Sequence, residues 1–99
     1  MFFKNKQILR FASVTGGTTI YFLDGSHIKI DESFESIELQ LKDSDFIRIH
    51  DKHIVNVNHI SKISNGTDDF IELSNSEVLP ISRKQKQIII ELISTNLEK

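Results

Sequence analysis

The chain reads F-I-R-I-H-D-K-H-I-V-N-V-N-H-I from Phe46 to Ile60, and this stretch bears on both fold and function. At its start apolar residues alternate with Arg48, which is the pattern of a half-buried strand. Polar and basic residues follow directly: His50, Asp51, Lys52 and His53. Because loops at strand ends carry much of protein recognition, the stretch predicts a binding surface there.

A second informative stretch reads L-P-I-S-R-K from Leu79 to Lys84 and opens a predicted C-terminal helix. Arg83, Lys84 and Lys86 fall in its first turns, where the helix dipole disfavours each exposed cation by about 0.3 to 1 kcal/mol. Free backbone N–H groups at a helix start bind anions, so these cations and the Ser82 hydroxyl form a candidate phosphate clamp. Ser82 is also placed to cap the helix, and the alternative is an incidental, solvated charge run.

Strands and one short helix are expected in the N-terminal half of the chain. The first strand ends at the turn-prone Gly16-Gly17 pair. The runs T-T-I-Y-F-L and S-H-I-K-I then flank an Asp-Gly pair, which is a strong hairpin signal. From Ser33 to Leu41 the apolar residues recur at helical spacing, with Asp31 or Ser33 placed to cap the helix.

Short strands return in the C-terminal half, after an acidic loop. They are expected at 46–49, around Val55, and at 60–63, 70–73 and 78–81, with a turn at Asn65-Gly66. The last two strands predict a second hairpin. A helix is expected from Ser82, with an apolar cluster on one broad face: Ile88, Ile89, Leu92 and Ile93. Many short strands with two helices predict a mostly β domain.

Length and composition fit one compact domain that spans residues 1–99. Cysteine is absent, which excludes disulfides and thiol-based metal or redox sites and fits a reducing cytosol. The N-terminus lacks the apolar run of a signal peptide, and no stretch approaches the ~20 apolar residues that span a bilayer. We therefore expect a soluble, cytoplasmic protein with no membrane association.

The charge balance is unusual for a nucleic-acid binder, because fourteen acidic residues against twelve basic ones give a net charge of -2. The acids gather at 31–38, 43–45 and 68–69, whereas the basic cluster at 83–86 meets no acid until Glu91. A dipolar surface with one basic face binds DNA with strong salt dependence.

Other side chains suggest chemistry only weakly. His50, His53 and His59 raise the question of a zinc site, but their spacing favours a partly buried histidine bonded to the backbone. Asn56 and Asn58 are expected to bond the backbone or cap a turn. No catalytic motif is present, so neither enzymatic activity nor a metal or other cofactor is expected.

The order F-x-R-x-H, I-V-N-x-N-H-I and L-P-x-S-R resembles the LytTR family of bacterial DNA-binding domains. The likeness runs from about Ile8 to about Leu92 and includes S-F-E-S-I-E-L-Q-L and I-E-L-S-N-S-E. It implies a mostly β fold, an elongated stack of small antiparallel sheets (a β-β-β sandwich) with one short helix and a C-terminal helix. It also implies that loops bind successive major grooves on one side of the DNA.

The resemblance implies base contacts from three places. They correspond to the loop around Gly17 and Thr18, to Asp51, and to Arg83. Arg83 can pair bidentately with guanine. Asp51 stands where the family usually offers arginine or asparagine; its carboxylate repels phosphate but can accept from cytosine N4.

Phosphate contacts, which set register without reading sequence, suit the nearby Lys52, Ser82, Lys84 and Lys86. Such domains typically read direct repeats, so two copies per site are expected; a homodimer on DNA is an open alternative, and none in solution is implied. Family members commonly carry a receiver or membrane-bound segment ahead of the domain. The chain is therefore expected to be either a stand-alone regulator or an excised C-terminal domain.

Two functions are compatible with these features. The first is a sequence-specific, double-stranded DNA-binding transcription regulator without enzymatic activity. The alternative is a protein-protein interaction module on a LytTR-like fold with weakened DNA binding, which the acidic balance and Asp51 suggest.

Overall fold

The computed structural model describes residues 7–64 and 69–97. Strands in these residues are β1 (Ile8–Val14), β2 (Gly17–Phe22), β3 (His27–Ile30), β4 (Phe46–His50), β5 (His53–Asn56), β6 (Ile60–Ile63), β7 (Phe70–Leu73) and β8 (Val78–Pro80). The helical elements are α1 (Phe34–Gln40), α2 (Arg83–Leu97) and the short 3-10 helix η1 (Val57–His59). The strands and helices predicted from the sequence are present, at or close to the expected bounds.

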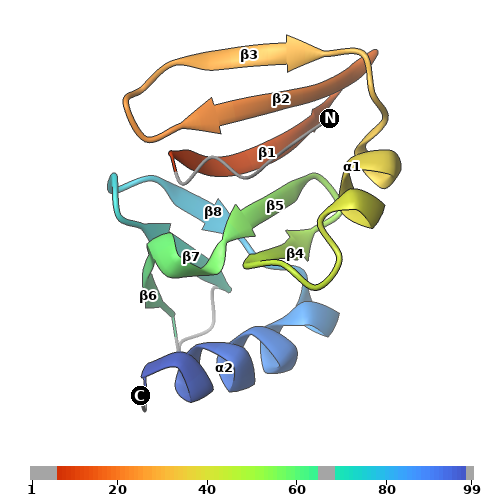
Figure 1. Ribbon diagram of the computed structural model, residues 1–99. Helices are drawn as coiled ribbons and strands as arrows, with labels where there is room; N and C mark the ends of the chain where they lie inside the picture. The colour runs from red at the N-terminus through yellow and green to blue at the C-terminus, as the bar shows by residue number, and fades with distance from the viewer. Residues whose placement is uncertain (1–6, 65–68, 98–99) are drawn as a thin grey trace.

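The larger sheet has five antiparallel strands in the order β3-β2-β1-β5-β4 (Figure 1). Its β2–β3 hairpin is the one that the Asp-Gly pair predicted. Gly25 has a φ of +93° in the turn, a conformation that side chains disfavour. Asp24 Oδ1 accepts a hydrogen bond from the backbone N–H of Ser26 at 2.9 Å. Together these two residues close the hairpin, which explains why the dipeptide predicts it.

The smaller sheet has three antiparallel strands in the order β6-β7-β8. Its β7–β8 hairpin confirms the second predicted hairpin. In the turn, Asn75 Oδ1 accepts from the backbone N–H of Glu77 at 3.1 Å, and Ser76 has a φ of 74°. The turn predicted at Asn65-Gly66 lies outside the described residues.

The short helix α1 packs on one face of the larger sheet (Figure 1). Ser33 caps it, because the Ser33 hydroxyl accepts from the backbone N–H of Ser36 at 3.1 Å, as predicted. Phe34 and Ile37 are buried in one core with Phe11 of β1. The apolar spacing that predicted the helix is therefore also the face that joins it to the sheet.

A bulge in β1 lets this strand contribute to two cores. The pairing of β1 with β2 shifts register between Ile8 and Arg10, so side chains leave strict alternation there. Ile8 and Phe11 belong to the core under α1, whereas Leu9 packs in the core formed with the smaller sheet and α2. Arg10 Nε and Nη2 donate to the two carboxylate oxygens of Glu77 at 3.0 and 3.1 Å. This bidentate pair ties β1 to the β7–β8 turn and thereby joins the two sheets.

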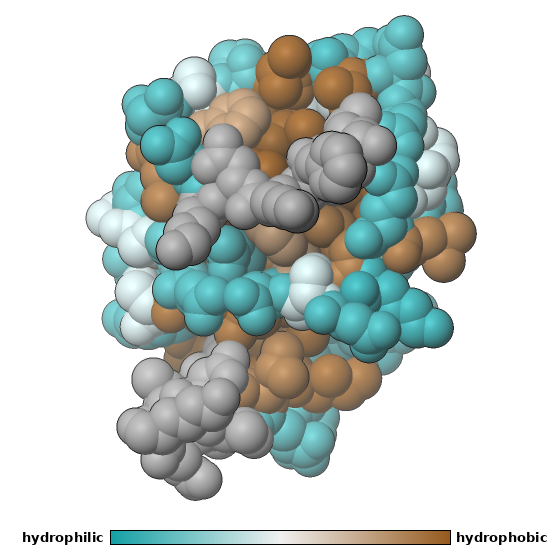
Figure 2. Space-filling view, viewed as in Figure 1, coloured by the Kyte–Doolittle hydropathy of each residue, from teal (hydrophilic) through white to brown (hydrophobic). Residues whose placement is uncertain are grey.

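Two of the residues predicted for the apolar face of α2 are exposed, and the side chain of Ile93 lies outside the described part of the structure. Ile89 is fully buried in the core with the smaller sheet, but Ile88 and Leu92 are 54% and 39% exposed. The difference arises because α2 packs along one side only, against β4 and the core that contains Ile71. Figure 2 shows apolar side chains in several patches separated by polar ones. Scattered apolar residues of this kind are ordinary on protein surfaces.

The fold is mostly β, with two antiparallel sheets, a short helix and a C-terminal helix, which confirms the predicted class. Its principal dimensions are 35 × 26 × 25 Å. Pairing of β1 with β5 brings strands from both halves of the chain into one sheet. In the described residues no helix is long and apolar enough to span a membrane.

Candidate nucleic-acid interface

Three chain segments meet at one edge of the molecule, on the right in Figure 1. They are the β1–β2 turn at Thr15-Gly16, the β4–β5 turn at Asp51-Lys52, and the segment that enters α2 at Ser82. The backbone N–H of Ser13 donates to the carbonyl of Lys52 at 3.0 Å, which links the first two. The N–H of Ser82 donates to the carbonyl of Ile49 at 2.8 Å, which links the last two. We call this side the three-turn edge.

The β4–β5 turn exposes Asp51 and Lys52 between the paired residues His50 and His53. The backbone N–H of Lys52 donates to Nδ1 of His50 at 3.2 Å. His50 therefore has the backbone-bonded, structural role that the sequence suggested. Within the described residues, neither the Asp51 carboxylate nor the Lys52 ammonium has a hydrogen-bond or ion-pair partner. Both charges are thus available to a ligand.

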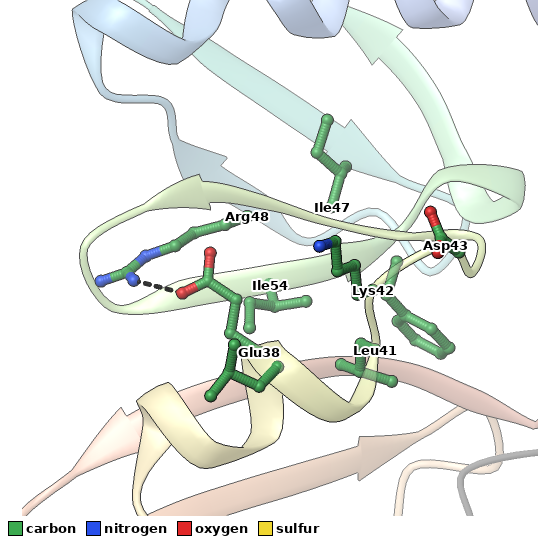
Figure 3. A pocket seen from close by; sticks show the side chains of 9 residues that line it. Glu38, Leu41, Lys42, Asp43, Ile47, Arg48 and Ile54 are labelled. Atoms are coloured by element: carbon green, nitrogen blue, oxygen red, sulfur yellow. Dashed lines mark hydrogen bonds and ion pairs between the residues drawn. The ribbon is translucent and has the colours of Figure 1, made fainter.

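Arg48 fixes the conformation of this turn. Its Nε donates to the carbonyl of His50 at 3.2 Å, and its Nη2 donates to the carbonyl of Asp51 at 2.9 Å. Its Nη1 donates to Glu38 Oε1 at 2.7 Å, which joins the turn to α1 (Figure 3). The guanidinium carbon also lies 5.1 Å from the ring centre of Phe34. Sequence reasoning missed this role, because only tertiary packing brings Glu38 to Arg48.

A polar cavity of about 220 Å³ lies between the β4–β5 turn and the start of α2. Its lining consists of Glu38, Arg48, His50, Asp51, Ser82, Lys84 and Gln85. The structure therefore brings together Asp51, Ser82 and Lys84, which belong to two different predicted contact places. The Ser82 hydroxyl is buried and has no hydrogen-bond partner in the part of the chain described. It does not cap α2 as predicted, and the helix start is instead closed by the bond from Gln85 N–H to the Ser82 carbonyl at 3.0 Å.

The three cations at the start of α2 have different surroundings. Arg83 and Lys84 are exposed and make no ion pair within residues 7–64 and 69–97. Lys86 Nζ instead lies 2.6 Å from Asp69 Oδ1, and the two side chains are only 25% and 21% exposed. The structure speaks against the predicted phosphate contact of Lys86, because Asp69 already neutralises its charge.

The structure also speaks against Gly17 and Thr18 as DNA contacts. Thr18 is fully buried, and its hydroxyl donates to a backbone carbonyl of the segment before α1 at 2.9 Å. A Cβ on Gly17 would lie 2.0 Å from the carbonyl oxygen of Ile30, so the close approach of β3 requires glycine. Both residues hold β2 in place, and the exposed part of this loop is the turn at 15–16.

Histidine and asparagine side chains near the edge are structural. Burial, reinforced by the charge of Arg10, lowers the pKa of His53 from 6.5 to about 4, so this residue is neutral near pH 7. Its ring lies 5.3 Å from that of His50, and the described residues contain no group of three metal-ligating side chains. Asn56 Oδ1 accepts from the N–H of Asn58 at 2.9 Å and caps η1, as expected from the sequence.

A second cavity, of about 360 Å³, lies between α1 and β4 on the other side of Arg48 (Figure 3). Most of its wall is apolar, from Leu39, Leu41, Phe46, Ile47 and Ile54. None of the predicted contact residues lines it, although Glu38 and Arg48 line both cavities.

The β scaffold presents exposed cations from the β4–β5 turn and from the first residues of α2, which defines a domain that binds through loops and a helix start. The family model described as LytTr DNA-binding domain matches residues 1–94, and the chain belongs to this LytTR family. Among solved structures it is similar to the LytTr DNA-binding domain of a protein described as a methyl-accepting/DNA response regulator from Bacillus cereus. Identity is 25% and the TM-score 0.76, over 88% of this chain and 81% of the other. No curated protein matches the chain significantly.

Membership of this family makes the chain a DNA-binding domain. The predicted resemblance is confirmed, and the arrangement of two antiparallel sheets and two helices is that of the family.

Proposed function

We propose that this chain is a sequence-specific regulator of transcription that reads the major groove of double-stranded DNA through the three-turn edge, without enzymatic activity. The observation that carries the proposal is the meeting of the β4–β5 turn with the start of α2 around one polar cavity. Exposed, unpaired cations stand on both sides of this junction, Lys52 on one and Lys84 on the other. Loops held by a rigid scaffold are well suited to recognition.

Arg83 is the proposed base-reading residue. It is exposed at the first position of α2 and has no acidic partner among the described residues. Its planar guanidinium can donate two parallel hydrogen bonds to O6 and N7 of guanine. Lys52 and Lys84 carry point charges on flexible stems and suit phosphate contacts that set register. The unpartnered hydroxyl of Ser82, beside the cavity, suits the same role.

Asp51 restricts the sequences that the domain can accept. Its exposed carboxylate repels phosphate, but in the major groove it can accept a hydrogen bond from N4 of cytosine. Because Arg48 binds the Asp51 carbonyl at 2.9 Å, the turn cannot easily withdraw the acid from the edge. We therefore propose a preferred site with cytosine facing this turn.

Each copy is expected to cover about one turn of the duplex. The longest dimension of the molecule is 35 Å, and a turn of B-DNA rises about 34 to 36 Å. Two copies on direct repeats then occupy the same side of the DNA if the repeats are about one helical turn apart. We propose that residues 1–99 form one domain, that it works in the cytoplasm, and that two copies contact each other only on DNA.

Fluorescence anisotropy with DNA from upstream of its own gene, titrated from low to moderate salt, tests the proposal. We expect binding at low salt that weakens linearly on a log–log plot, with a slope of about -0.9 for each phosphate neutralised. A duplex of scrambled sequence is the control and should bind more weakly at every salt concentration. Absence of binding at low salt, or binding without salt dependence, would overturn the DNA-binding proposal.

The alternative, a protein-protein interaction module, is favoured by one feature of α2. Ile88 and Leu92 lie four residues apart on this helix and are both exposed. Under this alternative the wild-type chain binds no preferred sequence, because Asp51 has weakened the DNA surface. An Asp51→Arg variant, which offers the arginine usual in the family, should then gain specific binding. Under the leading proposal the same change should alter which sequence is preferred.

A further inference from the structure

We infer that Lys29 contacts a DNA phosphate at the β1–β2 turn, so that each of the three turns of the edge has its own phosphate-binding cation. The inference rests on the proposed function and supplies a contact at the one turn where Gly17 and Thr18 offer none. Its ligand is the phosphodiester backbone, because an ammonium is a compact point charge that favours phosphate over a two-point match to a base edge.

The register of β3 brings Lys29 to this turn. Lys29 stands opposite Thr19, near the start of β2. Its Nζ lies 3.2 Å from the position that a Cβ on Gly16 would occupy. Gly16 has a φ of +83° and no side chain, so the ammonium sits directly beside the backbone of the turn. No local sequence pattern predicts this proximity, because the two residues meet only when the hairpin forms.

The ammonium of Lys29 forms no ion pair or hydrogen bond with the described residues that DNA binding would have to break. The ion pairs found within residues 7–64 and 69–97 are Arg10 with Glu77, Arg48 with Glu38, and Lys86 with Asp69. Lys29 is exposed, and in the same residues it makes neither an ion pair nor a hydrogen bond. A phosphate contact would therefore break no interaction of the folded protein.

The segment beside Lys29 is linked to the segments that carry the other cations of the edge. The β1–β2 turn is joined to the β4–β5 turn through Ser13, whose N–H binds the carbonyl of Lys52 at 3.0 Å. The β4–β5 turn in turn faces Lys84 across the polar cavity. Lys29, Lys52 and Lys84 thus stand one at each of the three segments of the edge. A duplex offers a phosphate on each strand about every 3.4 Å along its axis, so cations at separate segments can each find a phosphate.

An acid beside the turn makes Lys29 more important. The Cα of Asp31 lies 3.2 Å from the position of a Cβ on Gly17, so the exposed Asp31 belongs to the same end of the sheet. With Lys29 present, the two charges offset each other near the turn. Without Lys29, the turn keeps only the acid and repels the duplex.

Salt titrations of DNA binding by two matched variants test the inference. Lys29→Gln removes the proposed contact, whereas Lys62→Gln removes an exposed, unpaired lysine of β6, which lies on the opposite side in Figure 1. Lys29→Gln should make the slope shallower by about 0.9 and weaken binding several-fold on preferred and scrambled duplexes alike. Lys62→Gln should match the wild type. Thermal unfolding followed by circular dichroism checks that both variants are folded.

A second measurement identifies the phosphate that Lys29 contacts. Replacing single phosphates of the preferred duplex by neutral methylphosphonates should weaken the wild type at one or two positions that leave Lys29→Gln unaffected. If the wild type binds but Lys29→Gln has its slope and its methylphosphonate profile, the inference fails and the proposed function stands. If the wild type binds no DNA at low salt, both fail.

Discussion

Arg48 Nη1 lies 2.7 Å from Glu38 Oε1, and the same guanidinium binds two successive carbonyls of the β4–β5 turn. One side chain therefore sets both the position of α1 and the conformation of a proposed DNA-contacting turn. The exposure of Asp51 and Lys52 depends on a residue that is itself mostly buried.

Replacing Arg48 by lysine keeps the charge but loses the forked contact to the two carbonyls. We expect affinity for the preferred duplex to fall at least tenfold, equivalent to about 1.4 kcal/mol, while the salt slope stays unchanged. The ratio of preferred to scrambled binding measures the effect. Glu38→Gln is the matched control, because it removes the ion pair and leaves both carbonyl contacts. An unchanged ratio in a folded Arg48→Lys variant would contradict the supporting role.

Arg83→Ala should cost about 1 to 3 kcal/mol of binding free energy at the preferred site and relax specificity at one base pair. Lys86→Ala is the comparison, since its ammonium is paired with Asp69 at 2.6 Å. We expect Lys86→Ala to leave the salt slope and the sequence preference as they are. Binding-site selection on both variants measures this, and the reverse pattern would exchange the roles of the two residues.

Mild acid should destabilise the fold through His53. Burial, with the charge of Arg10, lowers its folded pKa from 6.5 to about 4. Between pH 6.5 and pH 4, His53 is protonated in the unfolded chain but neutral in the folded chain. The free energy of unfolding therefore falls as pH drops from 6.5 toward 4. Urea unfolding of the wild type and His53→Gln at pH 7 and pH 5 checks this. The variant should lose less stability between the two, and equal losses would count against the assignment.

Glu77 adds a separate loss at lower pH. Its hydrogen bond from Arg10 lowers the pKa of the carboxyl below its ordinary 4.5. The stabilisation from this pair is therefore complete above about 4.5 and is lost as pH falls through the folded pKa. Urea unfolding extended to pH 3 should show this lower step in His53→Gln as well as in the wild type, which separates the two groups.

Local chemistry explains which parts of the fold were predictable. The hairpin at Asp24-Gly25 and the cap at Ser33 depend on residues two or three positions apart, so their signals survive in the linear sequence. The bulge at Leu9 is different, because β1 contributes side chains to two cores, one on each face of the strand. No local sequence pattern around Leu9 predicts the bulge.

At the candidate site, the exposure of a residue was easier to predict than its partners. Arg83 and Lys52 are exposed as expected, and neither makes an ion pair with a described residue. The surroundings of Thr18 and Lys86 could not be predicted, because tertiary partners decide them: a carbonyl before α1 binds the hydroxyl, and Asp69 binds the ammonium. Arg48 was missed for the same reason.

The bulge in β1 also bears on how the domain is synthesised. The strands of the larger sheet leave the ribosome before β7 and β8, so the nascent sheet exposes Leu9 to water. Arg10 cannot form its ion pair until Glu77, 67 positions later in the chain, has been synthesised. A sheet with an uncovered apolar face is prone to aggregate until its partner arrives. An expression fragment of this domain must therefore extend beyond Ile89 of α2 if the core around Leu9 is to be covered.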